Sequence, residues 1–220
     1  MSSGLKTIQS IDECLEAVVG WIERSTGNGY FVLPLEEFQS KYGKVNPEDE
    51  FYQARMNYFL EYCVLERPMS GDKHGRAPVS YFFENSPDLT GDDSPASRLW
   101  INFSGFSHSI FQVMRPGSES LIVRDLITDR SFNIVPKGGE TLKYLKKNSI
   151  FQCFVFGNLE RRTLGQGLIV HPDNAANEIL KFIKTFKKYP SIKPSDLLRM
   201  FAATNMRFLR MQHVDPSIIY

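Results

Sequence analysis

Apolar residues recur every third or fourth position through the first half of the chain and again near its end, which predicts amphipathic helices. The clearest stripe begins near Ser10, and Ser10 with Glu13 has the spacing of a helix-capping box. A short extended piece is expected at 30–33. Helices are predicted over residues 10–25, 35–42, 46–65, 79–84, 95–105, 174–189 and 195–212.

The stretch from Ile110 to His171 interrupts this helical pattern with short runs that are typical of strands. The run at 150–156 is apolar on both faces, which predicts a central strand. The run at 120–127 is partly apolar on both faces, as expected for a small barrel covered by helices. Strands are predicted at 110–114, 120–127, 132–135, 150–156 and 167–170, with a helical turn at 142–147.

This order of elements predicts an α+β fold. N-terminal helices precede a small antiparallel β-barrel or bent sheet, and two C-terminal helices close over it. The three regions are residues 1–90, 91–172 and 173–220, and we expect them to form one compact unit. Residues 85–95 are rich in Asp, Ser, Pro and Gly without periodicity, so they are the expected connection between the first two regions.

The composition is that of a globular protein with a substantial core. Apolar residues make up 42% of the 220 residues, enough to stabilise a fold without a metal or a disulfide. Three well-separated cysteines fit free thiols in a reducing cytoplasm, and the first residues lack the apolar segment of a signal peptide. No apolar run reaches the roughly 20 residues of a membrane span, so a soluble cytoplasmic protein is expected.

Charge is unevenly distributed along the chain, although the net charge is only +1. Residues 1–66 are acidic overall and residues 173–213 are basic, which is typical of a C-terminal part that binds nucleic acid or another anionic surface. Solvated helix faces, or acidic and basic regions that face each other, give the same pattern. The candidate anion-binding residues are Lys181, Lys184, Lys187, Lys188, Arg207 and Arg210.

The sequence contains no recognisable catalytic, metal or cofactor motif. The four histidines lack the spacing of a local metal site, and neither a nucleophile elbow nor a phosphate-binding glycine loop occurs. Cys63 and Cys153 fall on apolar faces, where a thiol is a poor nucleophile. An enzyme would need a site assembled from distant residues, for which His74, His108 and Arg162 are the candidates.

A non-catalytic protein-binding or regulatory module of the bacterial cytoplasm is therefore the first hypothesis, without metal or cofactor. The apolar tail of Ile218, Ile219 and Tyr220 is a candidate docking segment for a protein partner or for a second copy of the chain. Nucleic-acid binding through the basic C-terminal helices is the second hypothesis, and an enzyme is the third. The loops at 70–76 and 85–95 are further places where a site is expected.

One known barrel class can be tested directly. Cyclic-dinucleotide receptors of the PilZ type need an RxxxR arm ahead of a (D/N)xSxxG strand. Asn102-Phe-Ser-Gly105 has the wrong spacing, and Arg161-Arg162 follows it instead of preceding it. The chain is therefore not assigned to that class.

Three other stretches form a recognisable pattern: Phe59-Leu-Glu-Tyr-Cys-Val-Leu-Glu-Arg-Pro68, Val123-Arg-Asp-Leu126 and Leu168-Ile-Val-His-Pro172. Over about residues 50–185 they resemble a family of uncharacterised bacterial proteins of deltaproteobacterial type, in which a helix precedes a small β-barrel. Tyr62 stands where that family has Trp. The resemblance implies no catalytic residues. It implies that Glu66-Arg67, Asp125 and His171-Pro172 join helices to barrel, and a buried Arg67–Asp125 pair is a hypothesis that follows from it.

Overall fold

The N-terminal half folds as helices packed around an aromatic core. The computed structural model describes residues 8–27, 29–135, 145–157, 162–189, 191–211 and 213–220. Its first elements are α1 (Ile11–Thr26), α2 (Val32–Tyr42), α3 (Tyr52–Leu65), α4 (Pro78–Glu84), the 3₁₀ helix η1 (Pro87–Thr90) and α5 (Pro95–Ser104). Helix α1 is capped as predicted, because the Ser10 hydroxyl accepts a hydrogen bond from the Glu13 amide.

Two helix starts differ from the prediction. Residues 30–33 are not extended, because α2 already begins at Val32. Helix α3 begins at Tyr52 and not at Asn46. The Asp49 carboxylate accepts a hydrogen bond from the Asn46 amide at 2.8 Å, so a side chain closes a local turn where a first helical turn was expected.

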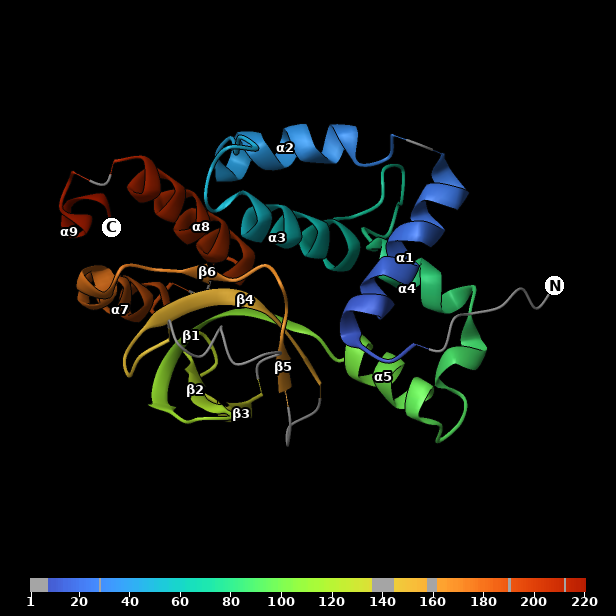
Figure 1. The fold of residues 1–220 in the computed structure, drawn as a ribbon. Coiled ribbons are helices and arrows are strands. Elements are labelled where there is room, and N and C mark those ends of the chain that lie inside the picture. Colours follow the sequence, from blue (N-terminus) through green and yellow to red (C-terminus); the bar gives the residue numbers. More distant parts are fainter. Residues whose placement is uncertain (1–7, 28, 136–144, 158–161, 190, 212) are drawn as a thin grey trace.

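The predicted β-rich stretch closes into a barrel (Figure 1). Its strands are β1 (Ser107–Pro116), β2 (Leu121–Asp125), β3 (Ser131–Ile134), β4 (Ile150–Gly157) and β5 (Arg162–Leu164), with β6 (Ile169–Val170) added on β4. The hydrogen-bonded order is β1-β2-β3-β5-β4, and β4 pairs again with β1 to close the barrel. The pair β3–β5 is parallel, whereas the other pairs are antiparallel.

Strand β5 was not predicted, because its three residues are too few to show a period of two. The predicted strand at 167–170 is only two residues long as β6. Residues 142–144 of the predicted helical turn lie outside the described residues, and residues 145–147 are not helical.

Strand β4 is buried along its whole length, as the pattern predicted. Three of its side chains, Phe151, Cys153 and Val155, point into the barrel core. Phe154 and Phe156 point the other way and pack against the N-terminal helices. One strand therefore joins the barrel to the helical half.

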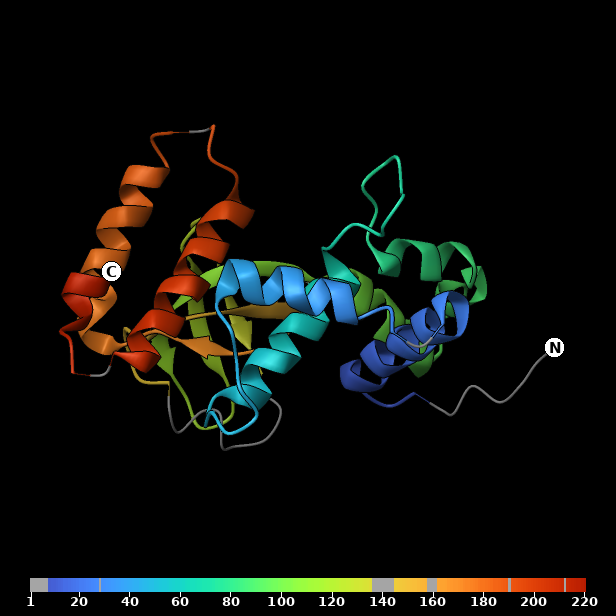
Figure 2. The ribbon, with the colours of Figure 1, turned by 90° about the horizontal axis from the view of Figure 1, so that it is seen from above.

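The C-terminal helices cover one side of the barrel, which confirms the predicted α+β architecture. These elements are η2 (Asp173–Ala175), α7 (Ala176–Phe186), α8 (Pro194–Arg210) and α9 (Pro216–Ile219). Ile110 of β1 and Ile150 of β4 pack with the buried faces of α7 and α8. Figures 1 and 2 show these helices beside and above β1 and β4, whereas no helix of the described residues covers the outer side of β2 and β3.

The hypothesis of a buried Arg67–Asp125 pair is wrong. The guanidinium of Arg67 pairs with the Glu37 carboxylate of α2 at 3.0 Å. The Asp125 carboxylate points into the barrel and accepts hydrogen bonds from the Ser109 hydroxyl at 2.6 Å and from the Ile127 amide at 2.8 Å. Each charge is satisfied by a nearer partner, so no ion pair spans the helices and the barrel at this point.

Candidate functional site

A β-bulge places Arg115 on the outer face of the barrel. Val113 pairs with Val123 across β1 and β2, but Arg115 pairs with Ile122, so one extra residue, Met114, is inserted between them. Without the bulge, the alternation of side chains would point Arg115 to the same side as Val113, into the barrel core. The bulge shifts the alternation by one residue and turns the guanidinium outward.

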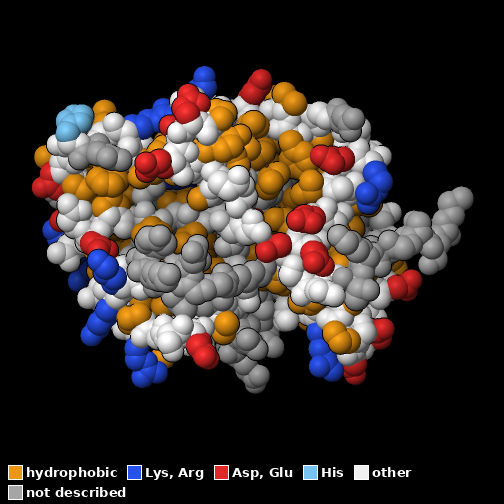
Figure 3. Space-filling model, viewed as in Figure 1, with side chains coloured by type: hydrophobic (Ala, Val, Ile, Leu, Met, Phe, Trp, Pro, Cys, Tyr) orange, Lys and Arg blue, Asp and Glu red, His pale blue; other side chains and the backbone are white. Residues whose placement is uncertain are grey.

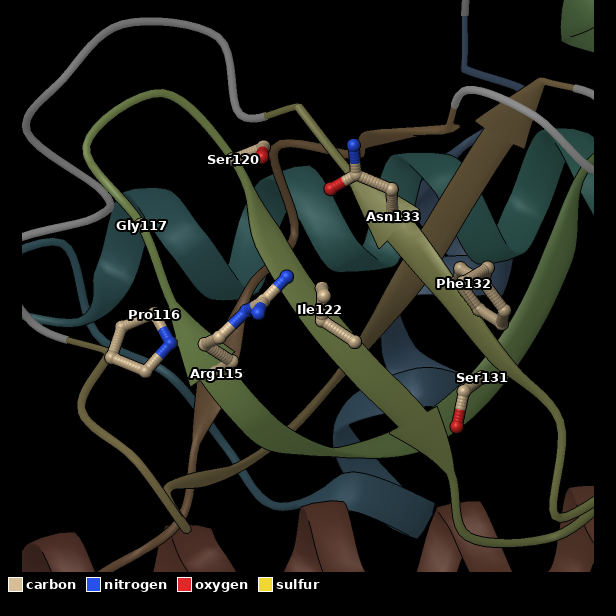
Figure 4. Close-up of a pocket in the computed structure, with 8 residues that line it drawn as sticks. All are labelled: Arg115, Pro116, Gly117, Ser120, Ile122, Ser131, Phe132 and Asn133. Atoms are coloured by element: carbon tan, nitrogen blue, oxygen red, sulfur yellow. The ribbon is translucent and has the colours of Figure 1, made fainter.

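Arg115 lies over a hollow of about 420 Å³ on the outer surface of β1, β2 and β3. Figure 4 shows Arg115 and Ile122 on neighbouring strands, with the guanidinium extended toward Ile122, and Ser120 and Asn133 near one end of the hollow. The described residues that line the hollow are Arg115, Pro116, Gly117, Ser120, Ile122, Ser131, Phe132 and Asn133.

The chemistry of this hollow favours an anion. Within the described part of the chain, Arg115 has neither an ion pair nor a hydrogen bond, and no described lining residue carries a carboxylate. Two serine hydroxyls and the Asn133 amide add neutral donors. A guanidinium with neutral donors around it matches the oxygens of a phosphate or a carboxylate.

A second hollow, of about 310 Å³, continues this surface toward α7. Arg124 points outward from β2 two residues after Ile122, about 7 Å farther along the strand. The described lining residues are Arg124, Leu126, Asp129, Leu180, Ile183, Lys184 and Lys187. We call Arg115, Arg124, Lys184 and Lys187 the basic face.

Asp129 is the acidic residue that lines the second hollow. Its carboxylate pairs with Lys187 at 2.5 Å and with Arg124 at 2.6 Å. These hydrogen bonds, first from Lys187 and then from Arg124, lower the pKa of Asp129. One carboxylate shared by two cations leaves positive charge in excess, and Figure 3 shows Lys and Arg side chains along the side of the molecule that carries α7 and β2.

The structure separates the basic residues that the sequence singled out. Lys184 and Lys187 join the basic face, whereas Lys181 pairs with Glu178 at 2.6 Å and Lys188 is exposed near the end of α7. Arg207 is exposed on α8. Arg210 faces the N-terminal region, where it pairs with Asp49 at 3.6 Å and donates a hydrogen bond to the Lys44 carbonyl.

Phe182 of α7 is an apolar residue of this helix, but it is 39% exposed. Its ring still contacts Phe201 edge-on at 5.7 Å. Part of the apolar stripe of α7 therefore stays at the surface.

The apolar tail folds back on its own chain. The Tyr220 ring stacks on Phe201, and its hydroxyl is 2.8 Å from Nδ1 of His171. Ile219 is half-buried, whereas Ile218 points outward and is 77% exposed. The part of the predicted docking segment that is open to a partner is therefore Ile218.

The three residues proposed for an assembled enzyme site lie in different surroundings. His74 lines a hollow of about 410 Å³ with Lys73 of the same loop and Tyr81 of α4. His108 lies at the helix–barrel joint, and Arg162 covers the Phe132 ring at 4.1 Å. The 70–76 loop is held closed by Asp72, whose pKa is lowered to about 2 by hydrogen bonds first from the Tyr81 hydroxyl and then from Arg76.

His108 belongs to a hydrogen-bonded chain that the sequence did not reveal. Nδ1 is 2.9 Å from the Glu66 carboxylate and Nε2 is 2.8 Å from the Tyr58 hydroxyl, which also accepts a hydrogen bond from the Gln152 amide. Burial raises the pKa of Tyr58 well above its usual range, so the phenol stays protonated. These contacts join α3 to β1 and β4, and we interpret them as structural.

Among the described residues, no group of three or more His, Cys, Asp or Glu side chains is arranged to hold a metal ion. Within the same residues, no helix is both long and apolar enough to cross a membrane. In comparisons with known proteins, no family model, curated protein or solved structure matches the chain.

Proposed function

We propose that the chain is a non-catalytic binding module that binds single-stranded nucleic acid across the basic face. The observation that carries this proposal is Arg115, which the bulge turns outward over a hollow that is lined by neutral donors and by no described carboxylate. A phosphate at Arg115 would gain charge-assisted hydrogen bonds there. Lys184 and Lys187 lie farther along the same surface and would contact later phosphates of one strand.

The architecture supports the same choice by analogy. Five-stranded barrels of the OB type bind oligonucleotides on their second and third strands and adjacent loops. The hollow under Arg115 lies on β2, β3 and the β1–β2 turn, and Ile122 offers apolar surface for a base.

The protein-binding hypothesis ranks second, because its docking segment is reduced to the exposed Ile218. An enzyme ranks third, because its three candidate side chains have different neighbours and share no pocket among the described residues. We place the module in a bacterial cytoplasm. This assignment is supported by the sequence resemblance and by the buried thiols of Cys63 and Cys153.

The test is binding of fluorescently labelled single-stranded DNA and RNA, followed by anisotropy between about 50 and 200 mM salt. Wild-type affinity should fall steeply with salt. Arg115→Ala should weaken binding of all sequences similarly and lower the salt slope by about 1, because one phosphate contact is lost. Lys184→Ala should have a similar effect.

The control is Arg98→Ala, which removes an exposed arginine of α5 away from the basic face. Its affinity and salt slope should match those of the wild type. Absence of wild-type binding at low salt, or equal affinities for the Arg115 and Arg98 variants, would refute the proposal.

A further inference from the structure

Helix α1 carries a second apolar stripe in addition to the one that it buries in the core. Ile11, Cys14, Val18 and Ile22 face the core. Leu15 and Val19 lie to one side and, with Leu60 of α3, line a groove of about 330 Å³. The groove is open to solvent on the face where α1 crosses α3.

The rim of this groove is acidic. Asp12, Glu16 and Glu23 of α1 line it, and the described chain offers no cationic partner to Glu16 or Glu23. Figure 3 shows acidic side chains gathered over the junction of α1 and α3. Apolar surface bordered by Glu16 and Glu23, two like charges without a described cationic partner, fits a partner segment that is apolar and basic.

The same chain presents such a segment at its opposite end. The connection between α7 and α8 exposes Tyr189 by 57% and Ile192 by 43%. A hydrogen bond from the Ile192 amide to the Tyr189 carbonyl at 3.2 Å keeps these residues in one turn, and exposed Lys188 and Lys193 flank them. Figure 2 shows this connection projecting from the molecule at the end far from α1. We call Lys188, Tyr189, Ile192 and Lys193 the basic tip.

We propose that the basic tip of one copy docks in the acidic groove of a second copy. The groove has room for a few side chains and not for a domain, which suits Tyr189 and Ile192. The two lysines would then meet the rim carboxylates of Glu16 and Glu23. This inference is independent of nucleic-acid binding, since none of these residues belongs to the basic face.

The geometry also predicts the form of the assembly. Groove and tip lie at opposite ends, so the contact is heterologous and every pair keeps one free groove and one free tip. Open chains should therefore grow with concentration. A contact this small falls below the size of a standard interface, so self-association should be weak.

The test is sedimentation velocity of the full chain up to about 1 mM, where even weak pairs form. The average mass should rise with concentration and fall again with added salt. Glu16→Gln/Glu23→Gln removes the acidic rim, and Tyr189→Ser/Ile192→Ser removes the apolar part of the tip. Each of these two double substitutions should weaken association at least tenfold. The control Glu48→Gln/Glu50→Gln removes equal charge from exposed sites elsewhere and should leave association unchanged.

A mixture of the two variants separates this proposal from other modes of association. The groove variant keeps an intact tip and the tip variant keeps an intact groove, so their mixture should form dimers and stop there. A wild type that stays monomeric, or a mixture no more associated than either variant alone, would overturn the proposal. So would association that depends on the tip but not on the groove. Arg115→Ala should leave association unchanged, which separates failure here from failure of the nucleic-acid proposal.

Discussion

His171 shows how burial sets the protonation of a single side chain. It lies at the end of β6, fully enclosed, and its Nε2 has no hydrogen-bond partner among the described residues. The buried Arg55 guanidinium lies near it and donates to the Asn205 side-chain oxygen at 2.5 Å and to the Ala202 carbonyl at 3.3 Å. Burial first, and the charge of Arg55 second, lower the pKa of His171 to about 3.

His171 should therefore be protonated in the unfolded chain at pH values where it stays neutral in the folded protein. Between the ordinary pKa of 6.5 and about 3, the unfolded state binds more protons, so the free energy of unfolding should decrease as pH falls. His171→Leu lacks this proton uptake. The difference in the free energy of unfolding between the wild type and this variant should therefore change by up to about 1.4 kcal/mol per pH unit. Urea unfolding between about pH 7 and pH 4.5 measures this difference. A difference that is constant with pH would contradict the lowered pKa of His171.

At the scale of elements, the turn between β5 and β6 is fastened to α3. The Glu61 carboxylate accepts hydrogen bonds from the Gln166 amide at 2.7 Å and from the Gly167 amide. Gly167 lies so close to α3 that a Cβ there would collide with the backbone of Tyr58. The close approach of Gly167 to a helix a hundred residues earlier appears only in the fold.

Gly167→Ala should therefore destabilise the protein, because the methyl group would meet backbone atoms that cannot turn aside. The expected loss is about 1–3 kcal/mol, as for overpacked cores. Gly91→Ala is the matched control, since its nearest neighbour would be 3.6 Å away and its backbone suits alanine, with an expected change within about 0.5 kcal/mol. Equal urea midpoints for the two variants would show that the turn can move away from α3.

At the scale of the whole molecule, β4 connects the separate cores. Its side chains alternate between the barrel interior and the N-terminal helices, and Ile150 at its start joins the C-terminal helices. Phe154 also stacks on the His108 ring at 4.1 Å. The cores therefore share one element, and loss of that element should disrupt all of them.

We expect helices and barrel to unfold in one transition. Phe154→Ala should lower the free energy of unfolding by about 3–5 kcal/mol and leave a single transition. Far-UV circular dichroism follows the helices. Tryptophan fluorescence follows Trp21 and Trp100 in the N-terminal core. A spectroscopic signal from Tyr220 would follow the C-terminal end. Midpoints that separate between these observables in the wild type would show that the regions are independent domains.

Much of the architecture could be predicted, but only part of the site. The order of helices and strands follows from local periodicity, and the burial of both faces of β4 from its apolar run. Lys184 and Lys187 were identified from the basic pattern of their helix. Arg115, Ser120, Ile122 and Asn133 were not, because nothing in their own segments marks them as neighbours.

The sequence by itself determined which of the longer segments are helices or strands and which of their faces are apolar, because these depend on the spacing of residues within one segment. Only the tertiary structure decided the closure of β1 on β4, the bulge that turns Arg115 outward and the pairing of Arg67 with Glu37. These features depend on register and on contacts between distant residues. A shift of one residue in register exchanges the two faces of a strand, and a composition pattern is the same before and after that shift.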